Sequence, residues 1–412
     1  MSFSISRFSS KSSSAKLLLS FSLLLSSAQL YADEIDNNWQ KTLAQAKQQT
    51  VYFNAWGGSE TINDYIRWAA EEVKQQYQVT VKQVKVTDAA DVVSRLLAEK
   101  SAGRTENGTI DLVWINGENF KAMKDQGLLA KAYTQELPNY QLVDTENKPS
   151  TRYDFTTAVE NLEAPWGMAQ LVFMYDSARM AHPPTDMYSL LTKLATNKGR
   201  FSYPALPNFH GTTFVKQALI ELIADQSLLS KPVVEADFQQ VTAPLWEYLD
   251  QLHPLLWREG RSFPKNAGQM KKLLNNGELF ISLSFNPNDA SNAIANQELP
   301  SSIKSYVHRG GTLGNTHFVA IPFNANASAG AKVFANFLMS AKAQLKKADP
   351  SVWGDPTVLD MKKLTAVDRQ AFADLPLGEA TLTAEQLGKV LLEPHSSWVR
   401  ALEKAWLARY AN

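Results

Sequence analysis

A glycine-containing loop near residue 57 carries the first group of residues that could bind a ligand. The segment Asn54-Ala-Trp-Gly-Gly-Ser-Glu60 lies between a β-prone run and a helical pattern. Adjacent glycines let the backbone approach a ligand closely, and serine is a favourable helix N-cap. N–H groups of the first helical turn could bind an anionic or carbonyl group, whereas an ordinary capped turn is the alternative. We predict ligand contact in this loop, through Trp56, Gly57, Gly58, Ser59 and Glu60.

A second loop, Trp114-Ile-Asn-Gly-Glu-Asn119, follows the β-prone run at 110–115. Ligands of open parallel sheets bind outside the carboxyl ends of the strands, so this loop reaches the same sheet edge as the first. Asn116 and Glu118 are its candidate binding residues. The alternative is a solvated turn whose asparagine caps the next helix.

A third loop, Leu206-Pro-Asn-Phe-His-Gly-Thr-Thr213, opens the clearest helix of the second half of the chain. Phe209 could stack on a ligand, and Gly211 and Thr212 could offer hydrogen bonds from the helix opening. Simple capping of the helix is the alternative.

A fourth polar loop follows the strand-like run at 279–285 and supplies Ser284, Asn286 and Asp289. A carboxylate beside an aromatic residue would suit an organic amine, although a surface turn containing proline is the alternative. Trp166, in Ala164-Pro-Trp-Gly167, is predicted to form a wall of the binding cleft, and packing at a hinge is its alternative role.

Catalytic and metal-binding signatures are missing from the sequence. It contains no Gly-x-Ser-x-Gly elbow, no phosphate-binding loop, no dinucleotide fingerprint and no His-Glu-x-x-His motif. Cysteine is absent, which removes disulfides, thiolate nucleophiles and Cys-ligated metals. We therefore expect no enzyme activity, no metal and no cofactor. A hydrolase that uses two carboxylates needs no sequence motif, so an exported hydrolase acting on sugars or peptides is the alternative.

Charge and the amino-terminal pattern predict an exported protein. Lys+Arg and Asp+Glu are equal at 41 each, so no basic excess exists to bind nucleic acid. Residues 1–32 combine three basic residues, a short apolar run from Leu17 to Leu25 and Ala32 before the first acidic residue. This pattern is typical of a cleaved signal peptide and predicts a periplasmic location, with a membrane anchor as the alternative.

Strand-like and helix-like patterns alternate along the rest of the chain and predict an α/β fold. The order βαβαβ between residues 51 and 123 requires parallel strands with helices on their faces. A second α/β block begins after His182-Pro-Pro184, and the chain ends in a helix around Trp398 to Trp406. Polar stretches near 156–166 and 304–314 are expected to cross between two lobes and to act as hinges.

The order of these segments resembles the periplasmic solute-binding proteins of ABC importers. The resemblance rests on Val51-Tyr-Phe-Asn-Ala-Trp56, Ile110-Asp-Leu-Val-Trp-Ile115, Gly277-Glu-Leu-Phe-Ile281 and Ile321-Pro-Phe-Asn-Ala-Asn326. It is similar to the branch that serves polyamines, thiamine and ferric iron, and within it to the YnjB-like subgroup. The polyamine members place an aromatic and a polar residue after the first strand, which matches Trp56 and Ser59. Their acidic ligand residues have no secure counterpart here, and the tyrosine pair of the iron binders is absent.

This resemblance implies a two-lobed, type II periplasmic-binding-protein fold with a ligand cleft between the lobes. We expect a first lobe of residues 33–160 plus 312–345 and a second of residues 166–305 plus 350–412. The implied function is capture of a small polar or charged organic ligand by hinge closure and delivery to an inner-membrane ABC permease, by a monomer. Thiamine-like molecules and amines are candidate ligands. Aromatic residues boxing a cation, and helix openings gripping an anion, are the two competing binding modes.

Overall fold

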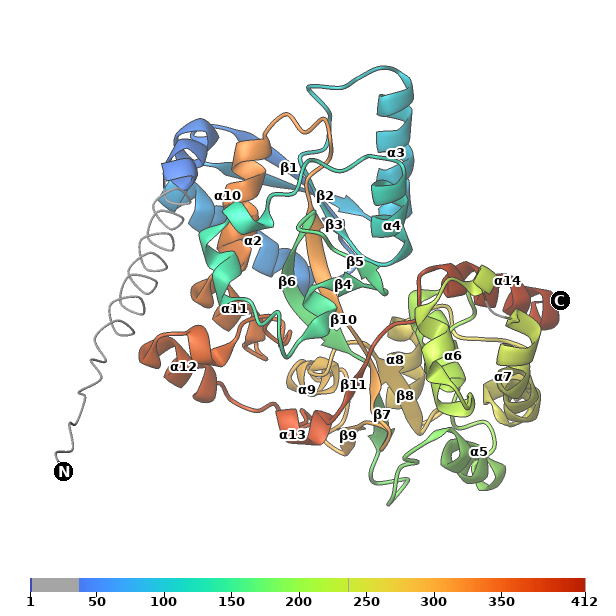
Figure 1. The fold of residues 1–412 in the computed structure, drawn as a ribbon. Coiled ribbons are helices and arrows are strands. Elements are labelled where there is room, and N and C mark those ends of the chain that lie inside the picture. The colour runs from blue at the N-terminus through green and yellow to red at the C-terminus, as the bar shows by residue number, and fades with distance from the viewer. Residues whose placement is uncertain (2–36, 236, 412) are drawn as a thin grey trace.

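The first strands and helices alternate as predicted in this computed structural model, which describes Met1, residues 37–235 and residues 237–411 (Figure 1). The predicted signal peptide therefore lies almost wholly outside the described residues. β1 (Thr50–Trp56) pairs in parallel with both β2 (Thr80–Val86) and β3 (Leu112–Ile115). Parallel neighbours need crossover connections, and helices supply them. They are α2 (Glu60–Tyr77) and α3 (Ala89–Ser101), and α4 (Glu118–Asp125) follows β3.

Antiparallel strands from later in the chain complete the larger sheet. β10 (Thr312–Ala320) pairs with β3 on one side and with β6 (Glu163–Gln170) on the other. The short β11 (Val390–Leu391) runs parallel to the first residues of β10. α10 (Ser328–Leu338) and α11 (Ala341–Ala348) pack on this sheet together with α2, and their apolar faces form the core of the first lobe.

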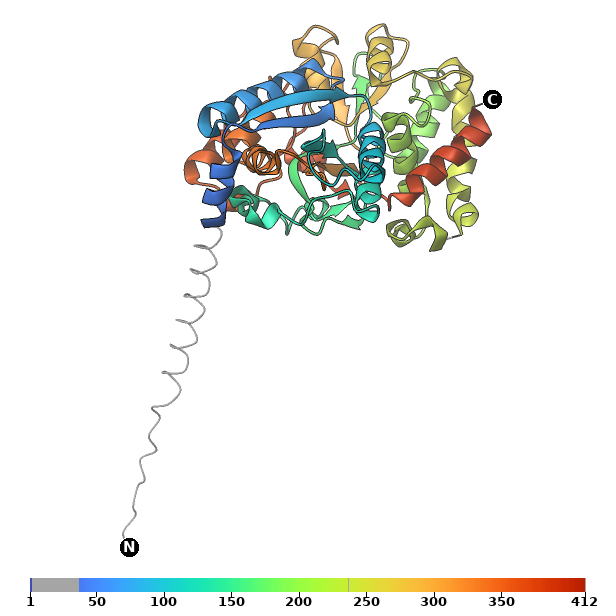
Figure 2. The same cartoon turned by 90° about the horizontal axis from the view of Figure 1, so that it is seen from above.

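The second lobe contains a smaller sheet of three strands. β7 (Val172–Asp176) lies in the centre and is antiparallel to both β8 (Ile281–Ser284) and β9 (Ile303–Tyr306). Helices surround this sheet, and the carboxy-terminal helix packs against α6 (Figure 2). The helices are α5 (Met187–Thr196), α6 (Phe209–Leu222), α7 (Phe238–Leu252), α8 (Ala267–Asn275), α9 (Asp289–Ala295) and α14 (Ser397–Tyr410). Large aromatic residues such as Tyr203, Phe214 and Trp406 fill its core.

Two segments that were expected in the second lobe belong to the first lobe. Residues 166–170, which were expected to begin the second lobe, belong to β6 in the larger sheet. Trp353 and Val358, also expected in the second lobe, are buried in the core of the first. Proline and glycine obscure the strand pattern of β6, and the segment after α11 has no periodic pattern, so neither placement had a local signal. In the described part of the chain, no helix is long and apolar enough to cross a membrane.

A buried ion pair fastens the segment after α11 to the larger sheet. The Lys347 ammonium pairs with Asp355, and both side chains are almost completely buried. The same ammonium lies 4.2 Å from the ring centre of Trp166 and 4.1 Å from that of Trp353, and it donates a hydrogen bond to the Trp166 carbonyl oxygen. Burial lowers the pKa of Lys347 to about 8, and the Asp355 carboxylate only partly offsets this effect.

Removing this ammonium should destabilise the fold strongly. We expect Lys347→Ala to lower the free energy of unfolding in urea by about 3–5 kcal/mol, because it leaves the Asp355 carboxylate buried without its ammonium partner, with His317 Nε2 at 3.2 Å as its remaining contact. Lys342→Ala, on the same helix, removes an exposed pair with Glu72 and should change the value by less than about 1 kcal/mol. Equal losses in the two variants would contradict the structural role of the buried pair.

Candidate ligand-binding cleft

Three crossings between the lobes meet at the first residues of β10. The first passes through Leu171, the second covers residues 307–311, and the third passes through β11 to α14. The Leu171 N–H donates to the Leu313 carbonyl oxygen at 2.7 Å, and the Thr312 N–H donates to the Lys389 carbonyl oxygen at 3.2 Å. The second crossing lies where the sequence predicted it, whereas the first comes after the predicted stretch at 156–166, because those residues already belong to the first lobe.

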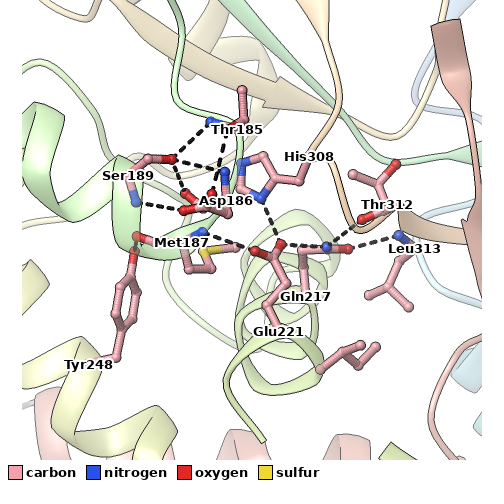
Figure 3. A network of polar contacts seen from close by, with 12 residues as sticks. Thr185, Asp186, Met187, Ser189, Gln217, Glu221, Tyr248, His308, Thr312 and Leu313 are labelled. Atoms are coloured by element: carbon pink, nitrogen blue, oxygen red, sulfur yellow. Dashed lines mark hydrogen bonds and ion pairs between the residues drawn. The ribbon is translucent and has the colours of Figure 1, made fainter.

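Side chains of α6 hold the second crossing in place (Figure 3). The Leu313 N–H donates to Gln217 Oε1 at 2.8 Å, and Gln217 Nε2 donates to Glu221 Oε1 at 2.7 Å. His308 Nδ1 lies 2.6 Å from the same Glu221 oxygen, while the Met187 N–H donates to Glu221 Oε2 at 2.9 Å. One glutamate of the second lobe therefore connects the crossing to the start of α5.

A cavity of about 290 Å³, called the first cavity from here on, lies between the lobes and brings together two of the predicted loops. Ser59 and Glu60 at the start of α2 line it from the first lobe, and Asn286 and Asp289 line it from the second. Ser59 caps α2, since its side chain accepts a hydrogen bond from the Ile62 N–H. The carboxyl end of β1 and the loop after β8 thus face one another across the cleft.

Acidic side chains outnumber basic ones in the lining of this first cavity. Glu60, Asp289 and Glu298 contribute carboxylates, and Lys271 is the basic side chain among the described lining residues. Lys271 Nζ lies 2.6 Å from Asp289 and 3.8 Å from Glu298. Glu60 pairs with Lys85 at 3.3 Å, but both side chains are more than half exposed, so water screens that pair.

Trp353 is a contact across the cleft that the sequence did not reveal. Its backbone carbonyl oxygen accepts hydrogen bonds from Asn286 Nδ2 at 3.3 Å and Asn292 Nδ2 at 3.2 Å, and the residue lines the first cavity. The ion pair of Lys347 fixes this tryptophan in the first lobe. Nothing in the local sequence around 353 indicates a role in the cleft, since the contact joins residues about sixty positions apart.

The second predicted loop faces a buried lysine of the other lobe. Glu118 begins α4, and burial raises the pKa of its carboxyl group despite the opposing effect of Lys216. Lys216 Nζ is 2.5 Å from Glu393 Oε2, and both side chains are only 2% exposed. The same ammonium lies 4.7 Å from the ring centre of Phe155. The Gly117 N–H donates to Asp154 Oδ2 at 2.6 Å, which holds the loop against the hairpin of β4 (Tyr153–Asp154) and β5 (Thr157–Ala158).

The third predicted loop combines an exposed ring with buried packing residues. Phe209 is 42% exposed and packs edge to face on Phe285. Gly211 lies against the Pro204 carbonyl oxygen, where a side chain has no room. Thr212 Oγ1 donates to Glu403 at 2.8 Å, and burial raises the pKa of that carboxyl group, as does the nearby charge of Glu118.

The remaining predicted residues of the first two loops have mixed roles. Trp56 is 42% exposed, and its indole lies over Gly58, where a Cβ atom would collide with it. The Gly57 carbonyl oxygen accepts a hydrogen bond from Asn63 Nδ2 at 3.2 Å, so this glycine shapes the loop. Asn116 is half-buried between β3 and α4.

Two other predicted residues lie inside the protein. Ser284 is buried and accepts a hydrogen bond from the Asn286 N–H, which fixes the turn after β8. Trp166 was predicted to wall the cleft, and the structure corrects this: its side chain is completely buried in the first lobe. β6 lies beside β10 inside the larger sheet, and the indole packs among Phe53, Trp114 and Trp353.

Four ionisable residues that make contacts between distant segments were missed by the sequence reasoning. Lys216, Glu393, Glu403 and Asp154 come from four separate segments, and each is buried or faces a residue far away in the chain. Lys216 lies within a buried stretch of α6, and only the loop that opens this helix was singled out from the sequence. A charged residue in an otherwise buried helix was the one available signal, because lysine is almost never fully buried without a partner.

Comparisons with known proteins agree with this two-lobed geometry. The model of the family described as bacterial extracellular solute-binding protein matches residues 68–366. Protein YnjB of Escherichia coli (strain K12) is 46% identical over 376 residues, which cover 91% of this chain and 95% of YnjB. The chain therefore belongs to the bacterial extracellular solute-binding protein family.

Solved structures of low sequence identity show the same fold. A putative spermidine/putrescine ABC transporter protein from Listeria monocytogenes has a TM-score of 0.60 at 13% identity, over 88% of this chain and 98% of that one. The periplasmic binding protein AfuA from Actinobacillus pleuropneumoniae, with fructose-6-phosphate bound, has a TM-score of 0.58 at 16% identity, over 89% and 99%. The type II periplasmic-binding fold predicted from the sequence is confirmed.

Neutralising Glu118 should make the protein more stable at neutral pH. Because burial raises the pKa of Glu118 in the folded state, the wild type loses stability as pH rises through that pKa. We expect the melting temperature of Glu118→Gln to exceed that of the wild type by a margin that grows between about pH 4 and pH 7. Thermal unfolding followed by circular dichroism at several pH values measures this margin.

Glu72→Gln is the matched control for this experiment. Its hydrogen bond with Lys342 lowers the pKa of Glu72, so this carboxylate stabilises the wild type at every pH above the ordinary glutamate pKa of 4.5. We therefore expect the melting temperature of Glu72→Gln to lie below that of the wild type at neutral pH, by a margin that does not change between about pH 5 and pH 7. A margin for Glu118→Gln that shrinks as pH rises would show that the cleft does not penalise the charge of Glu118.

Proposed function

We propose that this protein captures a small organic cation between its lobes and delivers it to an ABC permease of the inner membrane. The observation that carries the proposal is the first cavity, which both lobes line and in which carboxylates outnumber the single described ammonium. A ligand there completes a site that neither lobe forms alone. Thiamine-like molecules and amines fit this description.

The helix openings are less suited to an anion. Glu60 directly follows the N-cap of α2, so its carboxylate opposes a second negative charge at that helix start. At α6, the Thr212 hydroxyl already donates to Glu403, and Asn208 caps the helix by accepting from the His210 N–H. Side chains of the protein itself therefore already supply the hydrogen-bond acceptors at the N-termini of α2 and α6. This supports binding of a cation over binding of an anion.

Two exposed aromatic rings support the same choice. Trp56 at the end of β1 and Phe209 at the start of α6 are both 42% exposed and belong to opposite lobes. Both rings are therefore accessible to a ligand. An organic cation gains attraction from the face of a tryptophan of about 0.5–2 kcal/mol.

Closure of the cleft follows from the three crossings. They connect the lobes over short segments that are hydrogen-bonded to one another near Thr312, so rotation about this point is the available motion. A ligand with contacts on both lobes favours the closed arrangement by its difference in affinity for the two states. Export to the periplasm and a monomeric state complete the proposal. The exported hydrolase considered above receives no support from the comparisons.

Binding should be selective for charge and should depend on Trp56. We expect putrescine or thiamine to raise the melting temperature of the mature protein and to reduce its radius of gyration in X-ray scattering, whereas fructose-6-phosphate should do neither. Calorimetry should show at least about tenfold weaker binding for Trp56→Ala, which corresponds to about 1.4 kcal/mol.

Tyr52→Ala is the matched control, because Tyr52 lies on the same strand and is also 42% exposed, but it is near the amino end of β1, away from the carboxyl end that leads to Ser59 and Glu60. It should bind the cation as tightly as the wild type. Saturable binding of fructose-6-phosphate without binding of any cation would refute the proposed ligand class. An unchanged radius of gyration with bound cation would refute capture by closure.

A further inference from the structure

A second cavity, of about 280 Å³, lies at the other side of the cleft and contains none of the residues predicted from the sequence. Tyr153 and Phe155 of the β4–β5 hairpin line it from the first lobe, and Ser230 lines it from the second. Leu392 and Glu393 of the third crossing complete the wall. Together with residues of β10, four parts of the chain that are distant in sequence therefore enclose one space.

Asn315 on β10 presents an unused hydrogen-bond acceptor beside this second cavity. The residue lines the cavity and is only 4% exposed. Its Nδ2 donates to Glu393 Oε1 at 3.4 Å, whereas its Oδ1 has no partner among the described residues. A buried carbonyl oxygen without a donor is unfavourable by roughly 1–3 kcal/mol, so an occupant that donates a hydrogen bond is favoured here.

The lining also determines which chemical groups fit. Thr156 is also a lining residue, and its buried hydroxyl oxygen has no hydrogen-bond partner among the described residues. Of the described lining residues, Glu393 is the charged one, and no basic side chain is among them. Lys216 neutralises much of the Glu393 charge from outside the lining. A ligand carboxylate would lie beside the acceptor Asn315 Oδ1 and the Glu393 carboxylate, and the free donors among the described lining side chains are hydroxyl groups, with no cation to bind its charge.

We propose that the second cavity is a separate ligand subsite for a small amphipathic amine, whose N–H group donates to Asn315 Oδ1 and whose apolar body packs on Phe155, Tyr153 and Leu392. Its walls are mostly apolar, as in other small-molecule sites that use few polar groups to orient a ligand. The subsite goes beyond the proposed function, because it shares no lining residue with the first cavity.

Calorimetry on the mature protein with 2-phenylethylamine tests this subsite. The matched probes are 2-phenylethanol, which has a neutral donor, and 3-phenylpropionate, which has acceptors only. We expect the amine to bind most tightly, the alcohol more weakly and the carboxylate not at all. Equal binding of the amine and the carboxylate would overturn the proposal.

Two variants locate the binding. Asn315→Ala removes the acceptor and should weaken amine binding by about five- to tenfold, the effect of one hydrogen bond. Leu392→Ala, at a rim residue that is 46% exposed, should weaken it by a similar factor without disturbing the fold. The melting temperature without ligand checks that each variant folds.

Asp289→Asn separates this proposal from the proposed function. It alters the first cavity only, so it should leave binding of 2-phenylethylamine unchanged while weakening binding of putrescine. If Asp289→Asn weakens the binding of 2-phenylethylamine and Leu392→Ala does not, the amine occupies the first cavity. The second subsite is then refuted, although the proposed capture of a cation stands. If putrescine fails to bind while the phenylethylamine responds to Leu392→Ala, the subsite stands and the proposed function fails.

Discussion

The meeting of three crossings at Thr312 and Leu313 is the constraint on which the rest of this structure depends. Backbone hydrogen bonds join the first crossing to the second and the second to the third, and Gln217 of α6 accepts from the Leu313 N–H. All connections between the lobes are thus gathered at one place. Residues of both lobes line each of the two cavities, so the hinge closure proposed above would alter both of them.

The distribution of buried charge separates the parts that hold the fold from the parts that face the cleft. Lys347 is satisfied by Asp355 and two tryptophan rings, and Lys216 by Glu393, so these cations are committed to internal partners. Carboxylates such as Glu118 and Glu403 remain at the cleft with raised pKa values, mainly because burial penalises their charge. The charge on such groups reduces the stability of the protein, a conflict that is common at binding sites.

The sequence predicted which loops line the first cavity, but it did not predict contacts between residues that are distant in the chain. Ser59 and Glu60 meet Asn286 and Asp289, because loops at strand ends were correctly recognised as the places where polar residues gather. Trp166 was misplaced because an aromatic residue next to proline and glycine resembles a loop, whereas β6 is a strand of the larger sheet and its residues are almost all buried. Asn315 and Glu393 were missed because their pairing joins residues 78 positions apart, and no local pattern records such a contact.

The sequence by itself determined the class of fold, through the alternation of strand and helix periods from β1 onward and through caps such as Ser59. Side-chain periodicity and capping are local properties, which neighbouring residues carry wherever the segment lies. Tertiary structure alone decided which loop ends face one another, which lysines are neutralised inside the lobes and where two cavities open. Those outcomes depend on distances between segments that are far apart in the chain, and such distances arise only when the crossings bring the lobes together.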